Sequence, residues 1–107
     1  MKRIFVSGPY TLGDVAQNVK NSMDVSNDLI SLGFAPFCPH LTHFLHMNKF
    51  QPYEKWLEID LAFLRVCDAL IRIPGESNGA DKEVEFAKKL NIPIVYNIAD
   101  LKKIFNL

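Results

Sequence analysis

The sequence lacks a surplus of charge, has few cysteines and contains no long apolar run. Its 107 residues carry 12 Lys and Arg against 12 Asp and Glu, so the formal net charge is zero. Binding to duplex nucleic acid requires a basic surface, and this balance disfavours that function. No apolar stretch approaches the roughly 20 residues that span a bilayer, and the N-terminus does not resemble a secretory signal. We therefore expect neither a nucleic-acid nor a membrane partner.

The cysteine content points to a reducing compartment. Cys38 and Cys67 are too few for a disulfide framework, so we expect free thiols and a cytoplasmic protein. Apolar residues make up 49% of the chain, which favours a folded core over disorder. The length predicts a single domain over residues 1–107. A neutral domain of this size is typical of a protein that handles a small molecule.

Short apolar segments alternate with segments of helical periodicity. The segments with strand character are Arg3–Val6, Phe34–Phe37, Asp68–Ile73 and Ile92–Tyr96. The segments with helical character are 14–32, 52–66, 80–90 and 100–107. This order predicts an α/β fold: a small doubly wound, Rossmann- or flavodoxin-like parallel sheet of about four strands with flanking helices.

Local signals mark the helix ends. Asp14 and Gln17 match a capping box, and Gly33 and Asn91 suit the position just past a helix. In the segment 52–66 an apolar stripe at helical spacing predicts the buried face, and its members are Trp56, Ile59, Phe63 and Val66.

Ligands of open parallel sheets bind beyond the carboxyl ends of the strands, which makes the loops 7–14, 38–50 and 74–82 candidates. The first loop offers a close backbone approach and an aromatic side chain through Ser7, Gly8, Pro9 and Tyr10. It contains neither G-x-G-x-x-G nor a P-loop, which disfavours NAD. An ordinary turn with an incidental tyrosine remains the alternative.

The second loop contains His40, His43 and His46 close to Cys38, a composition that raises the possibility of zinc. Three-residue steps on a helix rotate the side chain by about 60° each time, so the outer histidines would diverge. No H-E-x-x-H pattern is present either, and we expect no metal. His40 directly follows a strand and is the best candidate to line a pocket, although a surface loop is also compatible.

The third loop opens a helix, where free backbone N–H groups bind anions. The residues expected to form this anion site are Ser77, Asn78, Gly79 and Ala80. Glu83 is expected in the first helical turn, where the helix dipole would stabilise its ionised form. An ionised carboxylate can attack an oxocarbenium-like sugar centre. Alternatively, Asp81 and Glu83 merely complement the dipole.

Asp60 lies in an otherwise apolar helical segment. It is therefore either on the solvent face or in the site. Partial burial would raise its pKa and suit it to general acid catalysis.

Together these segments resemble the nucleoside 2-deoxyribosyltransferase superfamily, including its deoxynucleoside monophosphate N-glycosidase branch and its short phage and bacterial members. The resemblance is carried by residues 4–10, 60–70, 77–87 and 91–94. It implies cleavage of an N-glycosidic bond with Glu83 as the nucleophile, resolved by water or by a second base. It also implies that Asp60 assists the leaving base and that Tyr10 lies near the nucleophile.

Further expectations follow from the same resemblance. Ser77 falls where the nucleotide-cleaving branch contacts phosphate, which favours a nucleotide over a free nucleoside. His40 and His43 are expected to line the base or sugar pocket. No cofactor is required, and a homodimer or larger homo-oligomer is implied. A non-catalytic protein that binds or sequesters a nucleotide, or a small subunit with a role in assembly, would be the alternatives.

Overall fold

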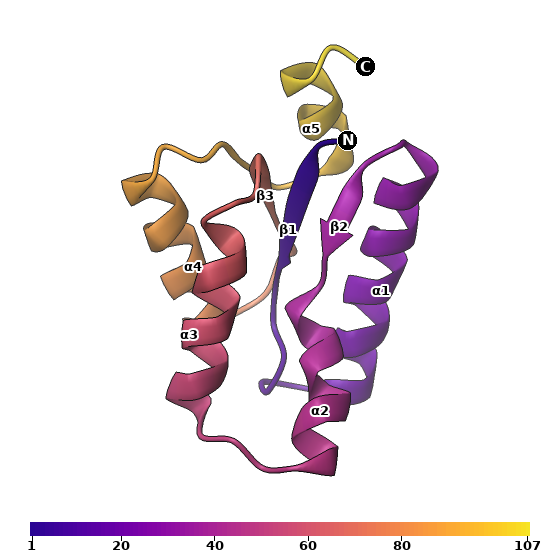
Figure 1. Ribbon diagram of the computed structural model, residues 1–107. Coiled ribbons are helices and arrows are strands. Elements are labelled where there is room, and N and C mark those ends of the chain that lie inside the picture. Colours follow the sequence, from indigo (N-terminus) through magenta and orange to yellow (C-terminus); the bar gives the residue numbers. More distant parts are fainter.

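The computed structural model describes residues 1–107 as a four-stranded parallel sheet with helices on both faces (Figure 1). The elements in chain order are β1 (Arg3–Ser7), α1 (Val15–Ser31), β2 (Ala35–Phe37), the 3₁₀ helix η1 (Pro39–Leu41), α2 (Thr42–Asn48), α3 (Tyr53–Leu64), β3 (Ala69–Arg72), α4 (Asn78–Lys89), β4 (Ile94–Val95) and α5 (Ile98–Ile104). The predicted α/β class is confirmed, and none of the helices is long and apolar enough to cross a membrane.

The order of the strands in the sheet indicates where a ligand would bind. The sheet reads β2-β1-β3-β4, and all three neighbouring pairs are parallel. The chain therefore moves to one side of β1 to form β2 and then crosses to its other side to form β3. This reversal creates a topological switch point at the carboxyl ends of β1 and β3, where open α/β sheets bind ligands.

Strand alternation sorts the core into two layers. On one face Ile4 and Val6 pack with Leu29 of α1 and Leu101 of α5. On the other face Phe5 and Leu70 pack with side chains of α3 and α4, namely Leu64, Val84 and Ala87. Because side chains of a strand alternate, the residues two positions beyond Phe5 and Leu70 face the same way. The sheet face under α3 and α4 therefore ends in two polar residues, Ser7 and Arg72.

The structure contains the predicted helix caps, except that only one half of the capping box at the start of α1 is formed. The Asp14 carboxylate accepts the backbone N–H of Ala16 at 2.9 Å, so it caps α1. The reciprocal half of the box is absent, because the Gln17 amide donates to the Asn21 side chain instead. Gly33 and Asn91 adopt φ values of 89° and 57°, as residues just past a helix do.

The histidine segment was wrongly expected to be a loop. It forms η1 and then α2, whose residues are all at least partly exposed to solvent. The Thr42 hydroxyl donates to the Pro39 carbonyl and links the two helices. A stretch that buries so little apolar surface gives no periodic hydrophobic signal, which explains why its helical state was missed.

The predicted buried face of α3 was also wrong. Phe63 and Val66 are 48% and 54% exposed. The face turned toward the sheet instead carries Leu57, Asp60, Leu61 and Leu64. The face toward the sheet contains a carboxyl group, that of Asp60. The prediction was based on apolar residues alone and therefore selected the neighbouring face of the helix.

Candidate active site

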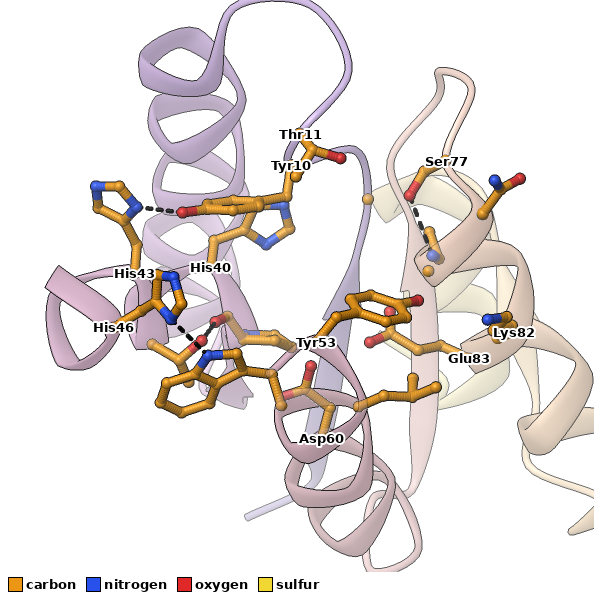
Figure 2. A pocket seen from close by; sticks show the side chains of 18 of the residues that line it. Tyr10, Thr11, His40, His43, His46, Tyr53, Asp60, Ser77, Lys82 and Glu83 are labelled. Carbon is orange, nitrogen blue, oxygen red and sulfur yellow. Dashed lines mark hydrogen bonds between the residues drawn. The ribbon is translucent and has the colours of Figure 1, made fainter. Parts of the chain in front are cut away.

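A cavity of about 650 Å³ lies at the carboxyl end of the sheet. It is lined by Gly8, which follows β1, by His40, which follows β2, and by Ser77, which follows β3. Residues of α3 form one of its sides. Its volume falls in the range of ligand pockets, which is about 300–1,000 Å³. Figure 2 shows the side chains converging from these elements.

Most of the residues predicted for the site line this cavity. They are Gly8, Tyr10, His40, His43, Asp60, Ser77, Asn78, Gly79, Ala80 and Glu83. Ser7 and Pro9 are not part of the lining. Ser7 is fully buried and donates its hydroxyl to Glu83, while the Pro9 carbonyl accepts from His40. These two residues therefore support lining side chains, where direct contact with a ligand was expected.

Two carboxyl groups project into the cavity from facing helices, Asp60 from α3 and Glu83 from α4 (Figure 2). Glu83 is only 7% exposed, and its Oε1 accepts the Ser7 hydroxyl at 2.7 Å. The Oδ1 atom of Asp60 is buried and has no hydrogen-bond partner. The apolar face of α3 thus places the carboxyl group of Asp60, one oxygen of which has no partner, near the hydrogen-bonded carboxyl group of Glu83.

Burial dominates the ionisation of this pair. It raises the pKa of Glu83 to about 8, although the Ser7 hydroxyl bond opposes the rise and the charge of Asp60 adds to it. Burial likewise raises the pKa of Asp60 to about 7. The expected stabilisation of ionised Glu83 by the helix dipole was wrong. Since α4 begins at Asn78, Glu83 lies in the second turn, beyond the reach of the dipole.

The two carboxyl groups interact and therefore titrate as a pair. Between about pH 7 and pH 8 the pair retains about one proton, because burial raises the pKa of Asp60 to about 7 and that of Glu83 to about 8. The Ser7 hydroxyl donates to Glu83 and favours its ionised form, whereas the bare Oδ1 of Asp60 receives no donor. The pKa of Glu83, about 8, exceeds that of Asp60, about 7, and by itself this order would place the proton on Glu83. We give the hydrogen bonds more weight, because only Glu83 has a donor for its charged form, and assign the shared proton to Asp60 and the negative charge to Glu83.

Histidines hold the loop that follows β1. The Nε2–H of His40 donates to the Pro9 carbonyl at 2.7 Å, since a carbonyl can only accept. The Tyr10 hydroxyl is hydrogen-bonded to His43 Nδ1, which places the phenol ring at the wall of the cavity (Figure 2). Asn18 of α1 donates to the carbonyls of Tyr10 and Leu12. The loop is thus fixed before any ligand enters.

The opposite wall is the start of α4. Ser77 caps this helix and accepts the N–H of Ala80 at 3.1 Å. The Ala80 N–H is therefore already satisfied, and the donors left for an anion are the first N–H groups of the helix, at Asn78 and Gly79, with the Ser77 hydroxyl. Gly79 also permits close packing, because a Cβ there would lie 3.3 Å from the Tyr53 hydroxyl.

Several lining residues were missed in the sequence. Tyr53 and Trp56 of α3, His46 of α2 and Lys82 of α4 all face the cavity. His46 Nδ1 accepts the Trp56 indole N–H at 2.9 Å and fixes the orientation of that ring. The Lys82 ammonium lies 5.2 Å from the centre of the Tyr53 ring. Two aromatic residues three positions apart, one turn before Asp60, are the signal that could have revealed this wall.

The histidine side chains are engaged with neighbouring aromatic residues. No group of three or more His, Cys, Asp and Glu side chains lies close enough to hold a metal ion. His43 and His46 instead use Nδ1 to bond Tyr10 and Trp56.

Structural comparison defines the class of fold. The 2-deoxyribosyltransferase of the psychrotolerant bacterium Bacillus psychrosaccharolyticus aligns with a TM-score of 0.65 and 19% identity over 86% of this chain and 69% of that one. A 2-deoxyribosyltransferase from Leishmania mexicana aligns with a TM-score of 0.66 and 17% identity over 90% of this chain and 63% of that one. The protein therefore has the α/β fold of the 2-deoxyribosyltransferases.

Comparison with sequence families gives a more specific assignment than the fold does. Residues 2–97 match the model of DUF7768, which is described as a domain of unknown function, and the chain belongs to that family. No curated protein matches the sequence.

The raised pKa of Glu83 predicts a cost in stability at alkaline pH. The ordinary pKa of Glu83 is 4.5, whereas the buried pair that it forms with Asp60 gives up its protons only at about pH 7 and 8, so between these values the folded state binds more protons than the unfolded state. The free energy of unfolding therefore falls as pH rises through this window. We expect Glu83→Gln to raise Tm by roughly 5 °C or more at pH 8.5 and to change it little at pH 4.5.

Thermal unfolding followed by circular dichroism at both pH values measures this difference. Glu85→Gln is the matched control, because Glu85 lies on the same helix but is exposed. An equal Tm difference at the two pH values would show that Glu83 ionises normally in the folded protein.

Proposed function

We propose that the protein cleaves the N-glycosidic bond of a (deoxy)nucleoside 5′-monophosphate or nucleoside through a covalent glycosyl-Glu83 intermediate, which is resolved by water or by a second base. The observation that carries this proposal is the buried carboxyl pair. Glu83 accepts a hydrogen bond from Ser7, Asp60 has one buried oxygen without a partner, and both carboxyl groups face a cavity in the size range of ligand pockets. The fold shared with 2-deoxyribosyltransferases supports the same class of reaction.

In the first step a Glu83 carboxylate oxygen attacks the anomeric carbon. The bond from that carbon to the base nitrogen breaks, and its electron pair leaves with the base. Asp60 transfers its proton to the departing base, so a neutral base is released and Asp60 becomes ionised. The Ser7 hydroxyl bonds one carboxylate oxygen of Glu83 and orients the group for attack.

In the second step an acceptor attacks the anomeric carbon and releases Glu83. With water, Asp60 takes up a proton and the free sugar or sugar phosphate leaves, which makes the enzyme a hydrolase. With a second base, the same step forms a new N-glycosidic bond, which makes it a transferase. Neither route requires a cofactor, because the only group moved besides the sugar is a proton.

The walls of the cavity suit the remaining parts of a nucleotide. Tyr10, Tyr53 and Trp56 offer aromatic surface for stacking against a base. Ser77 and the first N–H groups of α4 offer donors for phosphate. We place His40 and His43 beside the base or sugar, where they hold Pro9 and Tyr10.

Incubation of the purified protein with each deoxynucleoside 5′-monophosphate and each deoxynucleoside tests the proposal. Released base is measured by chromatography, with and without a second base as acceptor. We expect base release from at least one substrate, and exchange of bases would identify a transferase. Tight binding without turnover of any substrate would instead identify the second candidate, a nucleotide-binding or sequestering protein. The preformed anion site and aromatic walls would serve that function equally well.

Lys82 gives a prediction about the substrate. It is the single Lys or Arg that lines the cavity, and it forms no ion pair with a carboxylate. We expect Lys82→Gln to lower kcat/KM about 10- to 100-fold for nucleotides, because a charge-assisted contact to phosphate is lost. Turnover of nucleosides should not change, and Lys88→Gln at the far end of α4 is the control. An equal loss for both substrates would argue against phosphate recognition by Lys82.

A further inference from the structure

Arg72 is a buried cation that the reaction described above does not use. It is the last residue of β3 and is 8% exposed. In the sheet it is the register partner of Ser7, the last residue of β1. Register partners of parallel strands project to the same face, so both polar side chains lie on the side covered by α4. Ser7 donates its hydroxyl to Glu83 on that side, and Arg72 is in register with Ser7 on the neighbouring strand.

The guanidinium of Arg72 holds the loop that leads into α4. It donates to the carbonyls of Ile73 and Gly75, the latter at 2.8 Å, and to Asp81 at 3.2 Å. Gly75 in turn packs closely on the loop after β1, because a Cβ at this position would lie 2.6 Å from Pro9 Cγ. Its φ of 126° also requires glycine. Arg72 thus links the two loops that border the carboxyl pair.

The charge of Arg72 acts on Glu83. Burial is the largest influence on the pKa of this carboxyl group and raises it. The side chains that act on it are Ser7 from β1, Asp60 from α3, His40 from η1 and Arg72 from β3; Asp60 raises the pKa of Glu83, whereas Ser7, His40 and, with the smallest effect, Arg72 lower it. A guanidinium group stays protonated in proteins. The partner of Arg72, Asp81, is 70% exposed, so water screens the opposing charge and leaves most of the effect of Arg72 in place.

We propose that Arg72 is a positioning residue for Glu83: it fixes the Ile73–Gly75 loop against Pro9 and places a positive charge on the sheet face where Ser7 bonds Glu83. This inference rests on the proposed function, in which ionised Glu83 is the nucleophile. It explains why a strand that is otherwise apolar ends in a buried arginine, and why that arginine bonds three successive parts of one loop and helix.

Two variants separate the charge from the loop contacts. Arg72→Met removes both, whereas Arg72→Lys keeps the charge and loses the forked geometry. We expect Arg72→Met to raise the pKa of Glu83, because a positive charge that lowers it is removed. The acidic limb of the kcat/KM profile should move by the same amount. Arg72→Lys should leave the profile in place and lower kcat. Arg65→Met, which removes an exposed arginine that lies against Phe86, is the control.

The titration of Glu83 is measured directly by carbon-detected NMR of its carboxyl group, assigned by comparison with Glu83→Gln. This measurement does not require turnover. An inactive wild-type protein would therefore refute the proposed function while the titration still tests Arg72. Arg72→Gln replaces Arg72→Met if the latter does not fold. An unchanged Glu83 titration in the variant without the charge, or a shift as large in Arg65→Met, would overturn the inference.

Discussion

Replacing Glu83 by Gln is expected to abolish base release, with kcat reduced by at least about 10³-fold. The amide has nearly the shape of the carboxyl group and can still accept the Ser7 hydroxyl, so the cavity should persist. It is a poor nucleophile and cannot form the glycosyl ester. Steady-state release of base, measured with the best substrate of the wild-type protein, gives the size of the loss.

Two observations complete this experiment. Glu85→Gln, an exposed change on the same helix, should retain wild-type kcat. Binding of the nucleotide to Glu83→Gln, measured by calorimetry, should persist within a few-fold, because the variant retains every proposed contact to base and phosphate. Base release by Glu83→Gln at a rate near that of the wild-type protein would contradict its role as nucleophile.

Replacing Asp60 by Asn has the second largest expected effect. The variant cannot protonate the departing base, and we expect kcat to fall about 10²- to 10⁴-fold. The loss should be smaller for substrates whose base leaves readily without a proton. Wild-type activity should also decline as pH rises above about 7, because Asp60 then loses its proton. This alkaline decline should be absent or much weaker in Asp60→Asn.

The matched change on α3 is Glu58→Gln, which alters an exposed carboxylate on the same helix. Its kcat and pH profile should follow those of the wild-type protein. An alkaline limb that persists unchanged in Asp60→Asn would show that another group supplies the proton.

The fold and much of the site could be predicted from local sequence signals. The alternation of strands and helices predicted the parallel sheet, and the three loops selected by the rule for ligands at strand ends all border the cavity. Ser77 was predicted beside the start of a helix that was expected from residue 80, and the structure makes it the N-cap of α4, which begins at Asn78. These features depend on a few neighbouring residues, so they are present in the sequence itself.

The remaining features depend on packing between distant segments. Asp60 was ambiguous because only the orientation of α3 decides whether its carboxyl group meets water or the cavity. The raised pKa of Glu83 was missed because it results from burial by other elements rather than from the position of Glu83 on its helix. Tyr53 and Trp56 resemble ordinary amphipathic helix residues until α2 and α4 are placed beside them.

The most direct test of the central claim is to trap the intermediate. A 2′-fluorinated nucleotide slows both steps, because fluorine destabilises the oxocarbenium-like transition states. After acid quench, mass spectrometry of the intact protein and of its peptides should show one added sugar phosphate on the peptide that contains Glu83. The adduct should be absent in Glu83→Gln. In the wild-type protein it should disappear after an excess of acceptor base is added or after a longer incubation in water, because either acceptor releases Glu83. Release of base with no modification of Glu83 at any time would contradict the covalent mechanism.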